Sequence, residues 1–416
     1  MRRVIFHIDV NSAFLSWSAV KLLQEGQPDI RLVPSVVSGD PSDRRSIITA
    51  ASIPAKKLGI KTAQPVSMAL RTCPSLVIVR GDWDWYKHCS HGFIEICRSY
   101  SPDLQQFSID ECFIDMTFRL AGRDPVEVAT QLKEQIKQSL GFTVNVGVGS
   151  NKLLAKMASD FRKPDLVHTL WPEEIPTKMW PLPVRDLFFI GRATERHLLS
   201  MGIHTIGEIA KTPETVLRGA LKQHGSTVYR FANGIDNEPV IDTPPPNKGY
   251  GNSTTISHDV TDAVEAKQVL LHLCDTVGTR LRRDGVRAGV VTVSVRTYDL
   301  RWYSHQTVLS TPTNLTTELH SHACRLFDAC WDHTPIRSLG VHTARVSGDT
   351  ASRQLSFLDT TNYEKLDRMD RVVDAIRQRF GKRSVMRASL LPRPSADAAP
   401  QTPEADEDTP AEPSST

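Results

Sequence analysis

Two short stretches of this chain carry acids beside apolar runs: residues 4–14 read VIFHIDVNSAF, and residues 107–115 read FSIDECFID. Both are rich in β-branched and aromatic residues, which is typical of buried strands. Asp9 closes the first run, and Asp110 and Glu111 lie in the second. Charged side chains seldom lie beside an apolar core unless they are paired or bind a metal.

These acids allow two interpretations. Three carboxylates that converge from two strands would suit a pair of hard divalent cations, as in polymerases and nucleases. An Asp-Glu dipeptide is also common in solvated turns. Neighbouring strand residues face opposite ways, so Asp110 and Glu111 share a site only if the strand ends or bends there. The surrounding sequence favours the metal site.

That surrounding sequence continues with a helix signal and a third motif. Asn11 or Ser12 would cap a helix, which places Phe14 in its first turn, close to the carboxylate of Asp9. Residues 147–165 read GVGSNKLLAKMASDFRKPD. Together with DVNSAF and SIDE, this segment closely resembles the Y-family translesion DNA polymerases of the DinB/UmuC group. The motifs occur in the family's order, and the resemblance extends over about residues 1–390.

Composition and charge fit that resemblance. The 416 residues, 40% hydrophobic and 23% charged, contain no run of 18 apolar residues, so no membrane span is expected. Seven cysteines without metal-finger spacing indicate the reduced thiols of a cytoplasmic protein, here expected to be nucleoid-associated. Residues 393–416 carry net −5, which leaves +8 on the rest. This asymmetry suggests a polyanion-binding surface, although chance excess on a solvated surface is the alternative.

The resemblance implies an α+β, multidomain right-hand polymerase. Residues 1–165 alternate strand-like and helix-like segments, and the segments from about 254 to 346 have the order βαββαβ of a split-βαβ module. The tail is too polar to offset the entropy of ordering. The expected domains are a ferredoxin-like palm (1–165) with inserted small fingers (about 12–75), a helical thumb (166–242), a linker (243–247), a βαββαβ little finger (248–347), a C-terminal segment with a clamp-binding motif (348–392) and a disordered acidic tail (393–416).

Two parts of the chain are candidates for holding DNA. Gly191, Gly202 and Gly207 lie in a pattern that resembles a helix–hairpin–helix, where turns before helix starts present N–H groups to phosphates. An ordinary helical hairpin with glycine caps is the alternative. Arg282, Arg283 and Arg296 lie in the little finger, which holds duplex DNA in the family. There the alternative is a solvated, charged helix end.

The resemblance also implies roles at the metal site. Two Mg²⁺ ions would activate the primer 3′-hydroxyl and stabilise the leaving pyrophosphate. Asp9 and Asp110 would bridge the ions, Glu111 would help to bind the one nearer the primer, and the Val10 carbonyl would be a further ligand. Asn11 stands where many members have a second Asp, and we do not count it as a ligand.

The nucleotide-binding residues follow the family pattern in part. Phe14 stands at the steric gate that excludes ribonucleotides, although a core aromatic is the alternative. Lys163 matches the phosphate-binding lysine. Lys56 stands where the family usually has Arg, and Ile53 where it usually has Tyr. A weaker or altered grip on the triphosphate is therefore expected, because isoleucine lacks the tyrosine hydroxyl and an ammonium lacks the guanidinium fork.

A third motif concerns a partner protein. A five-residue segment resembles the peptide by which bacterial polymerases bind the sliding clamp, with the usual Leu-Phe ending reversed. Its residues are Gln354, Leu355, Ser356, Phe357 and Leu358. A plain core turn is the alternative.

The sequence therefore predicts an error-prone, template-directed polymerase that performs translesion synthesis on primer–template DNA with dNTPs. One alternative is a non-catalytic DNA- and clamp-binding adaptor, but such proteins typically lose the acids. A nucleotidyl transferase or cyclase that works without a template is another, but it would not need a duplex grip. An accessory protein of the damage response is a further candidate partner.

Overall fold

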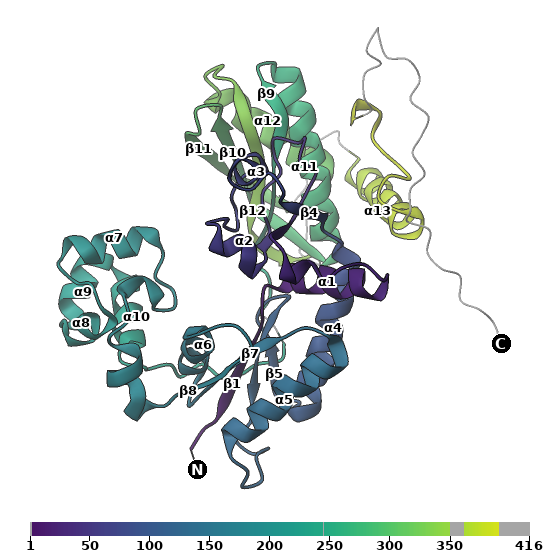
Figure 1. The fold of residues 1–416 in the computed structure, drawn as a ribbon. Coiled ribbons are helices and arrows are strands. Elements are labelled where there is room, and N and C mark those ends of the chain that lie inside the picture. The colour runs from purple at the N-terminus through teal and green to yellow at the C-terminus, as the bar shows by residue number, and fades with distance from the viewer. Residues whose placement is uncertain (1, 244, 350–361, 391–416) are drawn as a thin grey trace. The chain divides into compact units, whose positions relative to one another are not determined.

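The computed structural model describes residues 2–243, 245–349 and 362–390. It divides into two compact units, Met1–Pro245 and Pro246–Thr416 (Figure 1). The boundary falls within the proline-rich stretch where the sequence predicts a linker. No described helix is long and apolar enough to cross a membrane.

The palm is built on a five-stranded sheet. Its strands, in the order β5-β6-β1-β7-β8, are β5 (Leu104–Gln106), β6 (Glu111–Asp115), β1 (Ile5–Val10), β7 (Val144–Gly149) and β8 (Val167–Leu170). Strand β1 alternates, because Phe6 and Ile8 lie in the main core while Ile5 packs with Ala155 on the other face. Helices α4 (Trp83–Tyr100) and α5 (Pro125–Leu140) contribute to the main core, and α6 (Lys152–Asp160) carries Ala155.

The second acidic run differs from the sequence expectation at its start. Residues 107–110 are not strand; they form the turn of a hairpin between β5 and β6, and β6 begins at Glu111. The N–H of Phe107 donates to the Glu111 carbonyl at 3.0 Å and closes this turn. The chain therefore bends between Asp110 and Glu111, which is the condition for these two acids to share a site.

Helix α6 lies unusually close to β7 because of two glycines. A Cβ on Gly147 would lie 1.9 Å from the Ala155 carbonyl oxygen, and one on Gly149 would lie 2.6 Å from the Ala155 nitrogen. Any larger residue would push the helix off the sheet. This close contact brings the side chains of α6 over the strand that carries Asp9.

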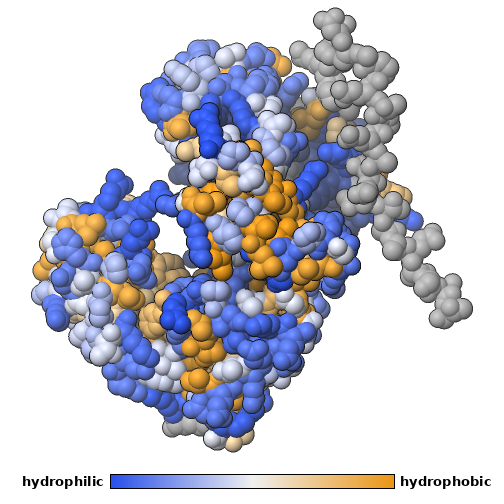
Figure 2. Space-filling view, viewed as in Figure 1, coloured by the Kyte–Doolittle hydropathy of each residue, from blue (hydrophilic) through white to orange (hydrophobic). Residues whose placement is uncertain are grey.

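The fingers have a small core of their own. Sheet β3-β2-β4 and helices α2 (Ile53–Lys57) and α3 (Val66–Thr72) surround buried Val36, Ile48 and Ala55, with strands β2 (Ser35–Ser38), β3 (Ala50–Ala51) and β4 (Val77–Arg80). Helix α1 (Ala13–Gln24) instead joins the palm core. Figure 2 shows hydrophobic side chains gathered at the surface over the fingers elements.

The thumb is a cluster of short helices that lies beyond β8 in the same unit (Figure 1). Leu198, Leu217 and Val228 belong to a core that continues into the palm through Leu154 and Met157 of α6. The helices are α7 (Arg192–Ser200), α8 (Ile206–Lys211), α9 (Glu214–Leu221) and α10 (Gln223–Ala232).

The second unit has the predicted βαββαβ order. Its strands, in the order β11-β10-β12-β9, pack helices α11 and α12 against a core that includes Val293, Leu319 and Val341. The elements are β9 (Gly249–Val260), α11 (Ala263–Arg283), β10 (Val286–Thr297), β11 (Trp302–Thr313), α12 (Thr316–Cys330) and β12 (Ile336–Gly348). Helix α13 (Tyr363–Phe380) follows.

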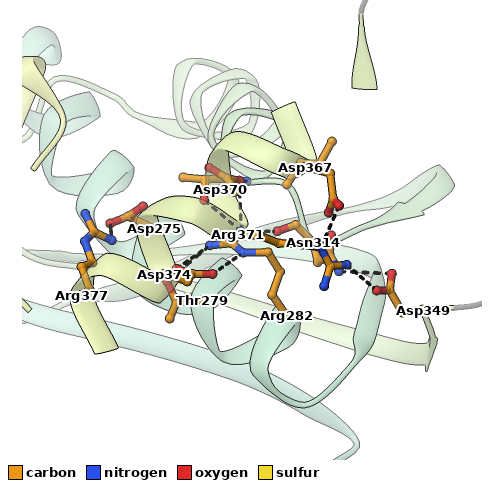
Figure 3. Close-up of polar contacts among 12 residues, drawn as sticks. Asp275, Thr279, Arg282, Asn314, Asp349, Asp367, Asp370, Arg371, Asp374 and Arg377 are labelled. Carbon is orange, nitrogen blue, oxygen red and sulfur yellow. Dashed lines mark hydrogen bonds and ion pairs between the residues drawn. The ribbon is translucent and has the colours of Figure 1, made fainter. Parts of the chain in front are cut away.

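Helix α13 is joined to this unit by buried ion pairs (Figure 3). Asp370 accepts from Arg282 at 3.0 Å, from Arg387 at 2.7 Å and from the backbone N–H of Thr316 at 2.9 Å. Helix α12 begins at Thr316, and the preceding Leu315 offers no side-chain cap. Asp370 thus neutralises a buried arginine and caps a helix on another element, so α13 is an integral part of the unit.

We expect Asp370→Ala to lower the stability of the full chain by about 3–5 kcal/mol, because it leaves Arg282 buried with a lost partner. Asp367→Ala is the matched control on the same helix. Asp367 pairs with the half-exposed Arg371 at 2.7 Å, a contact worth about 0–1 kcal/mol. Urea unfolding monitored by circular dichroism measures both variants. Equal losses in the two would contradict the structural role of Asp370.

Candidate active site

The register of two strands brings the acids together. Asp9 on β1 lies directly opposite Glu111 on β6, so both side chains are on the same face of the sheet. Asp110 precedes Glu111 in the hairpin turn, and its carbonyl accepts the N–H of Val10 at 3.0 Å. The ends of the two acidic runs are therefore held together through the main chain.

Glu111 is held by two neighbours on the same face. Its carboxylate accepts from Lys156 of α6 at 2.7 Å and lies 3.1 Å from Nε2 of the fully buried His7. Burial raises the pKa of Glu111, but the hydrogen bonds from His7 and Lys156 outweigh it and bring that pKa to about 2. The other ring nitrogen of His7 lies 2.8 Å from the hydroxyl of Ser159. Glu111 is thus ionised and fixed in place.

Asp110 lies in a less favourable environment. Burial raises its pKa, and the charges of Asp9 and Glu111 raise it further. A hydrogen bond from the Ser108 hydroxyl at 2.6 Å offsets part of this effect. Negative charge is therefore concentrated at this point, and a bound cation would relieve it.

The donor set fits a hard divalent cation, although the carboxylates are turned toward lysines. Over the described ranges, no three acidic, histidine or cysteine side chains surround one point. Asp9 is paired with Lys163, and Glu111 with Lys156. Carboxylate oxygens are the ligands that Mg²⁺ and similar ions prefer, and the like-charge repulsion at Asp110 is what such an ion would remove.

Two ammonium groups lie beside the acids. Lys163 also contacts Asp160 at 2.8 Å, and Lys56 donates to the Ser12 hydroxyl at 2.8 Å. Burial lowers the pKa of Lys56, and the nearby charge of Lys163 lowers it further. The two cations therefore repel each other. An anionic ligand between them would offset this repulsion and raise the pKa of Lys56 again. Ile53, 46% exposed, adds no polar group there.

The segment that carries Lys163 is positioned by buried amides that sequence reasoning missed. Asn11 accepts from the backbone N–H of Asp165 at 2.9 Å and donates to Asn145, which in turn donates to the Arg162 carbonyl at 2.7 Å. Asn11 is thus a structural residue, in keeping with its exclusion from the ligands. His7, Lys156 and Asn145 were also missed. For His7 and Asn145 the available signal was a polar residue at an inward position of an apolar strand, whereas Lys156 lies on helix α6.

Phe14 lies in an aromatic cluster next to the acidic end of β1. Its ring stacks on Tyr86 with centroids 4.9 Å apart and meets the edge of Trp83 at 5.3 Å. Trp83 is 58% exposed, whereas Tyr86 is buried. The Phe14 ring is partly exposed and held on one side by this cluster, which is compatible with a gate as well as with a core residue.

The fold and these acids agree with three comparisons. The impB/mucB/samB family matches residues 8–160, its C-terminal domain matches residues 247–357, and the IMS family HHH motif matches residues 172–203. DNA polymerase IV of Clostridium acetobutylicum is 41% identical over 392 residues, which cover 94% of this chain and 99% of that protein. The chain belongs to the Y-family DNA polymerases.

Other similar proteins support the assignment. DNA polymerase IV 1 of Bacillus subtilis strain 168 is 32% identical over 395 residues, 94% of this chain and 93% of that protein. Among solved structures, the Y-family DNA polymerase chimera Dbh-Dpo4(243-245)-Dbh superposes with a TM-score of 0.71 at 22% identity. It covers 82% of this chain and 99% of its own, and it supports the right-hand polymerase fold.

Two of the three thumb glycines have structural roles in this Y-family polymerase. The N–H of Gly207 donates to the Trp180 carbonyl at 3.0 Å, and a Cβ there would lie 2.9 Å from the Trp180 side chain. Gly202 has a left-handed φ of 76°, and its N–H donates to Leu199. Gly207 is buried and its amide is used inside the fold, so that predicted DNA contact is wrong. Gly202 is exposed and makes the tight turn that the helix–hairpin–helix pattern requires, so its DNA contact stays a prediction. Gly191 precedes α7 without a side-chain cap and stays a predicted contact.

The predicted DNA contacts of three arginines have different outcomes. Arg282 is wrong as a DNA contact, because its side chain is 3% exposed and is bound by Asp370 and Asp374. Arg283 is 70% exposed beside Asp284, and Arg296 lies 5.5 Å from the Trp302 ring centroid, so both stay predictions. The clamp peptide Gln354–Leu358 and the acidic tail 393–416 lie outside the described residues.

We expect Asp110→Asn to stabilise the polymerase in metal-free buffer while abolishing synthesis. The raised pKa means that the ionised Asp110 carboxylate costs folding free energy at pH 7, and an isosteric amide removes that cost. Melting temperatures with EDTA and with Mg²⁺ measure the effect. Mg²⁺ should raise the melting temperature of the wild type and change that of the variant less. A variant less stable than the wild type in EDTA would contradict the charge argument.

Proposed function

We propose that this Y-family polymerase copies DNA past damaged bases, and that Asp9, Asp110 and Glu111 form its catalytic centre. The chain is a template-directed DNA polymerase by its family. The observation that carries the residue assignment is the position of these acids on one edge of the palm, next to the repelling lysines Lys56 and Lys163. An acidic site for cations beside a basic site for phosphates is what nucleotidyl transfer requires.

In this proposal Asp9, Asp110, Glu111 and the Val10 carbonyl would hold two Mg²⁺ ions. Such ions lower the pKa of the primer hydroxyl and stabilise charge on the leaving pyrophosphate. Lys156 and His7 keep Glu111 oriented and ionised.

Lys163 and Lys56 hold the triphosphate of the dNTP in this proposal. Neither ammonium group can form the two parallel hydrogen bonds that a guanidinium forms with a phosphate. Each lysine therefore attracts the phosphate as a point charge. Ile53 adds no hydrogen bond.

Lesion bypass is attributed to the fingers. They are a small subdomain with its own core, and Ile47, Ile53 and Met68 are about half exposed on their surface. A small apolar surface can cover a nascent base pair without testing its shape closely, which tolerates distorted templates and lowers fidelity. Because the substrate is chromosomal DNA, the protein is expected in the cytoplasm with the nucleoid. No observation favours the non-catalytic adaptor.

Primer extension tests the proposed function. The purified full chain with Mg²⁺ and all four dNTPs should extend a primer on an undamaged template and past an abasic site. Asp110→Ala should lose about 10³-fold or more in rate, because a metal ligand set contributes several kcal/mol to the transition state. Binding of primer–template DNA should be retained. Stalling at every lesion would contradict bypass, and extension by the variant would contradict the assigned centre.

The steric gate has a separate test. We expect Phe14→Ala to raise incorporation of ribonucleotides by on the order of 10- to 100-fold relative to deoxyribonucleotides, because the ring no longer blocks the 2′-hydroxyl. The ratio of kcat/KM for dCTP and CTP on one template measures this selectivity. Phe93→Leu, a fully buried phenylalanine of the same core, serves as the control for general loss of packing. An unchanged ratio in Phe14→Ala would leave Phe14 as a core aromatic.

A further inference from the structure

A row of aromatic rings runs from the catalytic hairpin of the palm to the thumb. Phe107 contacts Phe113 with ring centroids 5.7 Å apart and contacts Phe188 of the thumb at 6.2 Å. Phe188 contacts Phe189 at 4.3 Å, and both contact Phe231. All of these residues belong to the first unit. Two rings of the row are open to solvent, since Phe107 is 47% exposed and Phe189 is 60% exposed.

One end of this row lies beside the acids. The N–H of Phe107 donates to the Glu111 carbonyl at 3.0 Å, so its ring projects from the same short hairpin that carries Asp110. In a polymerase with this catalytic centre, the primer 3′-hydroxyl has to come within reach of these acids. The nucleotides just behind the primer terminus therefore pass next to Phe107.

The other end lies beside the start of a thumb helix. Phe189 is two residues before Gly191, which precedes α7. Helix starts are favourable places for phosphates. The space-filling view in Figure 2 shows hydrophobic patches among the hydrophilic surface of the lobe that α7–α10 form. The row thus connects the catalytic acids to a second place where DNA backbone is expected.

The backbone of Phe189 points to a function for its ring. Its φ is 71°, in the left-handed region that a bulky residue rarely adopts and glycine adopts readily. A turn selected only for its shape would favour glycine here. An exposed ring in a strained backbone conformation is instead characteristic of functional positions.

We propose that Phe107, Phe188 and Phe189 form an aromatic surface that packs against the primer strand behind its 3′ terminus. This inference rests on the proposed catalytic centre. Because the primer behind its terminus is paired with the template, the rings contact its sugars and backbone rather than stack on its bases, and such contacts do not depend on sequence. Such a surface holds the primer end by apolar contact, independently of whether the template opposite it is damaged.

Phe189→Gly separates this role from a structural one, because the two roles predict opposite changes. Glycine relieves the left-handed backbone, and the largely exposed ring contributes little burial, so the melting temperature should not fall. The dissociation constant for primer–template DNA, measured by fluorescence anisotropy, should rise about 3- to 10-fold, because the variant loses the apolar area that the primer would cover. Phe118→Ala, which removes an 83% exposed ring outside the row, should leave both quantities unchanged.

Two further readouts locate the contact. Unprimed template should bind wild type and Phe189→Gly equally, since the surface faces the primer. Phe107→Ala should show the same primer-specific loss. An unchanged affinity for primer–template DNA, an equal loss on unprimed template, or a fall in melting temperature that accompanies the affinity loss would overturn the proposal.

The same assay keeps this inference apart from the proposed function. With saturating DNA, the control Phe118→Ala should add the first nucleotide at the wild-type rate in a single turnover, whereas Asp110→Ala should not add it. If the wild type adds no nucleotide, the proposed catalytic centre is wrong. The dissociation constants of wild type and Phe189→Gly for primer–template DNA still test the aromatic surface in that case.

Discussion

The candidate active site depends on the pairing register of two antiparallel strands. Asp9 faces the α6 side of β1 because Phe6 and Ile8 occupy the side of the main core, and Glu111 is its partner across β6. A slip of one residue would turn the acids into the apolar core and the apolar residues outward. The large core under α4 and α5 therefore fixes the register, and the register fixes the position of two acids.

Two of the three acids of the site are paired with lysines in the absence of substrate. Asp9 is paired with Lys163 and Glu111 with Lys156, while Asp110 keeps a raised pKa and Lys56 a lowered one. The unfavourable charges are the two that a metal–nucleotide complex would satisfy, one with its cations and one with its phosphates. In the proposed site, a cation at Asp9 would free Lys163 to contact phosphate. The structure is thus prepared for a ligand that brings both signs of charge.

Much of the fold could be predicted because its signals are local. Alternating strands and the βαββαβ order of the second unit follow from neighbouring residues. The bend at Asp110 was a condition that the sequence set for a shared site, and the structure meets it. Arg282 shows the limit of such signals. It ends a helix among other arginines and resembles a solvated cation, but Asp370, 88 residues later, buries it. Gly207 fails for the same reason, since Trp180 from a distant segment takes its N–H. His7 and Asn145 gain their roles only when α6 and the Lys163 segment pack over the sheet.

The long-range contacts that local signals miss are also the ones that distinguish structural residues from DNA-binding residues. A cation or glycine whose hydrogen-bonding groups are already used inside the fold has none left for phosphate, as Arg282 and Gly207 show. Arg283 and Arg296 differ because their guanidinium groups lie partly at the surface. Phe189 also differs from Arg282 and Gly207, because its ring is exposed and can contact DNA although its backbone is strained. Candidate DNA contacts in this polymerase are therefore best ranked by whether their hydrogen-bonding groups or rings stay exposed and unpaired after folding. The charge of a side chain alone is a poor guide.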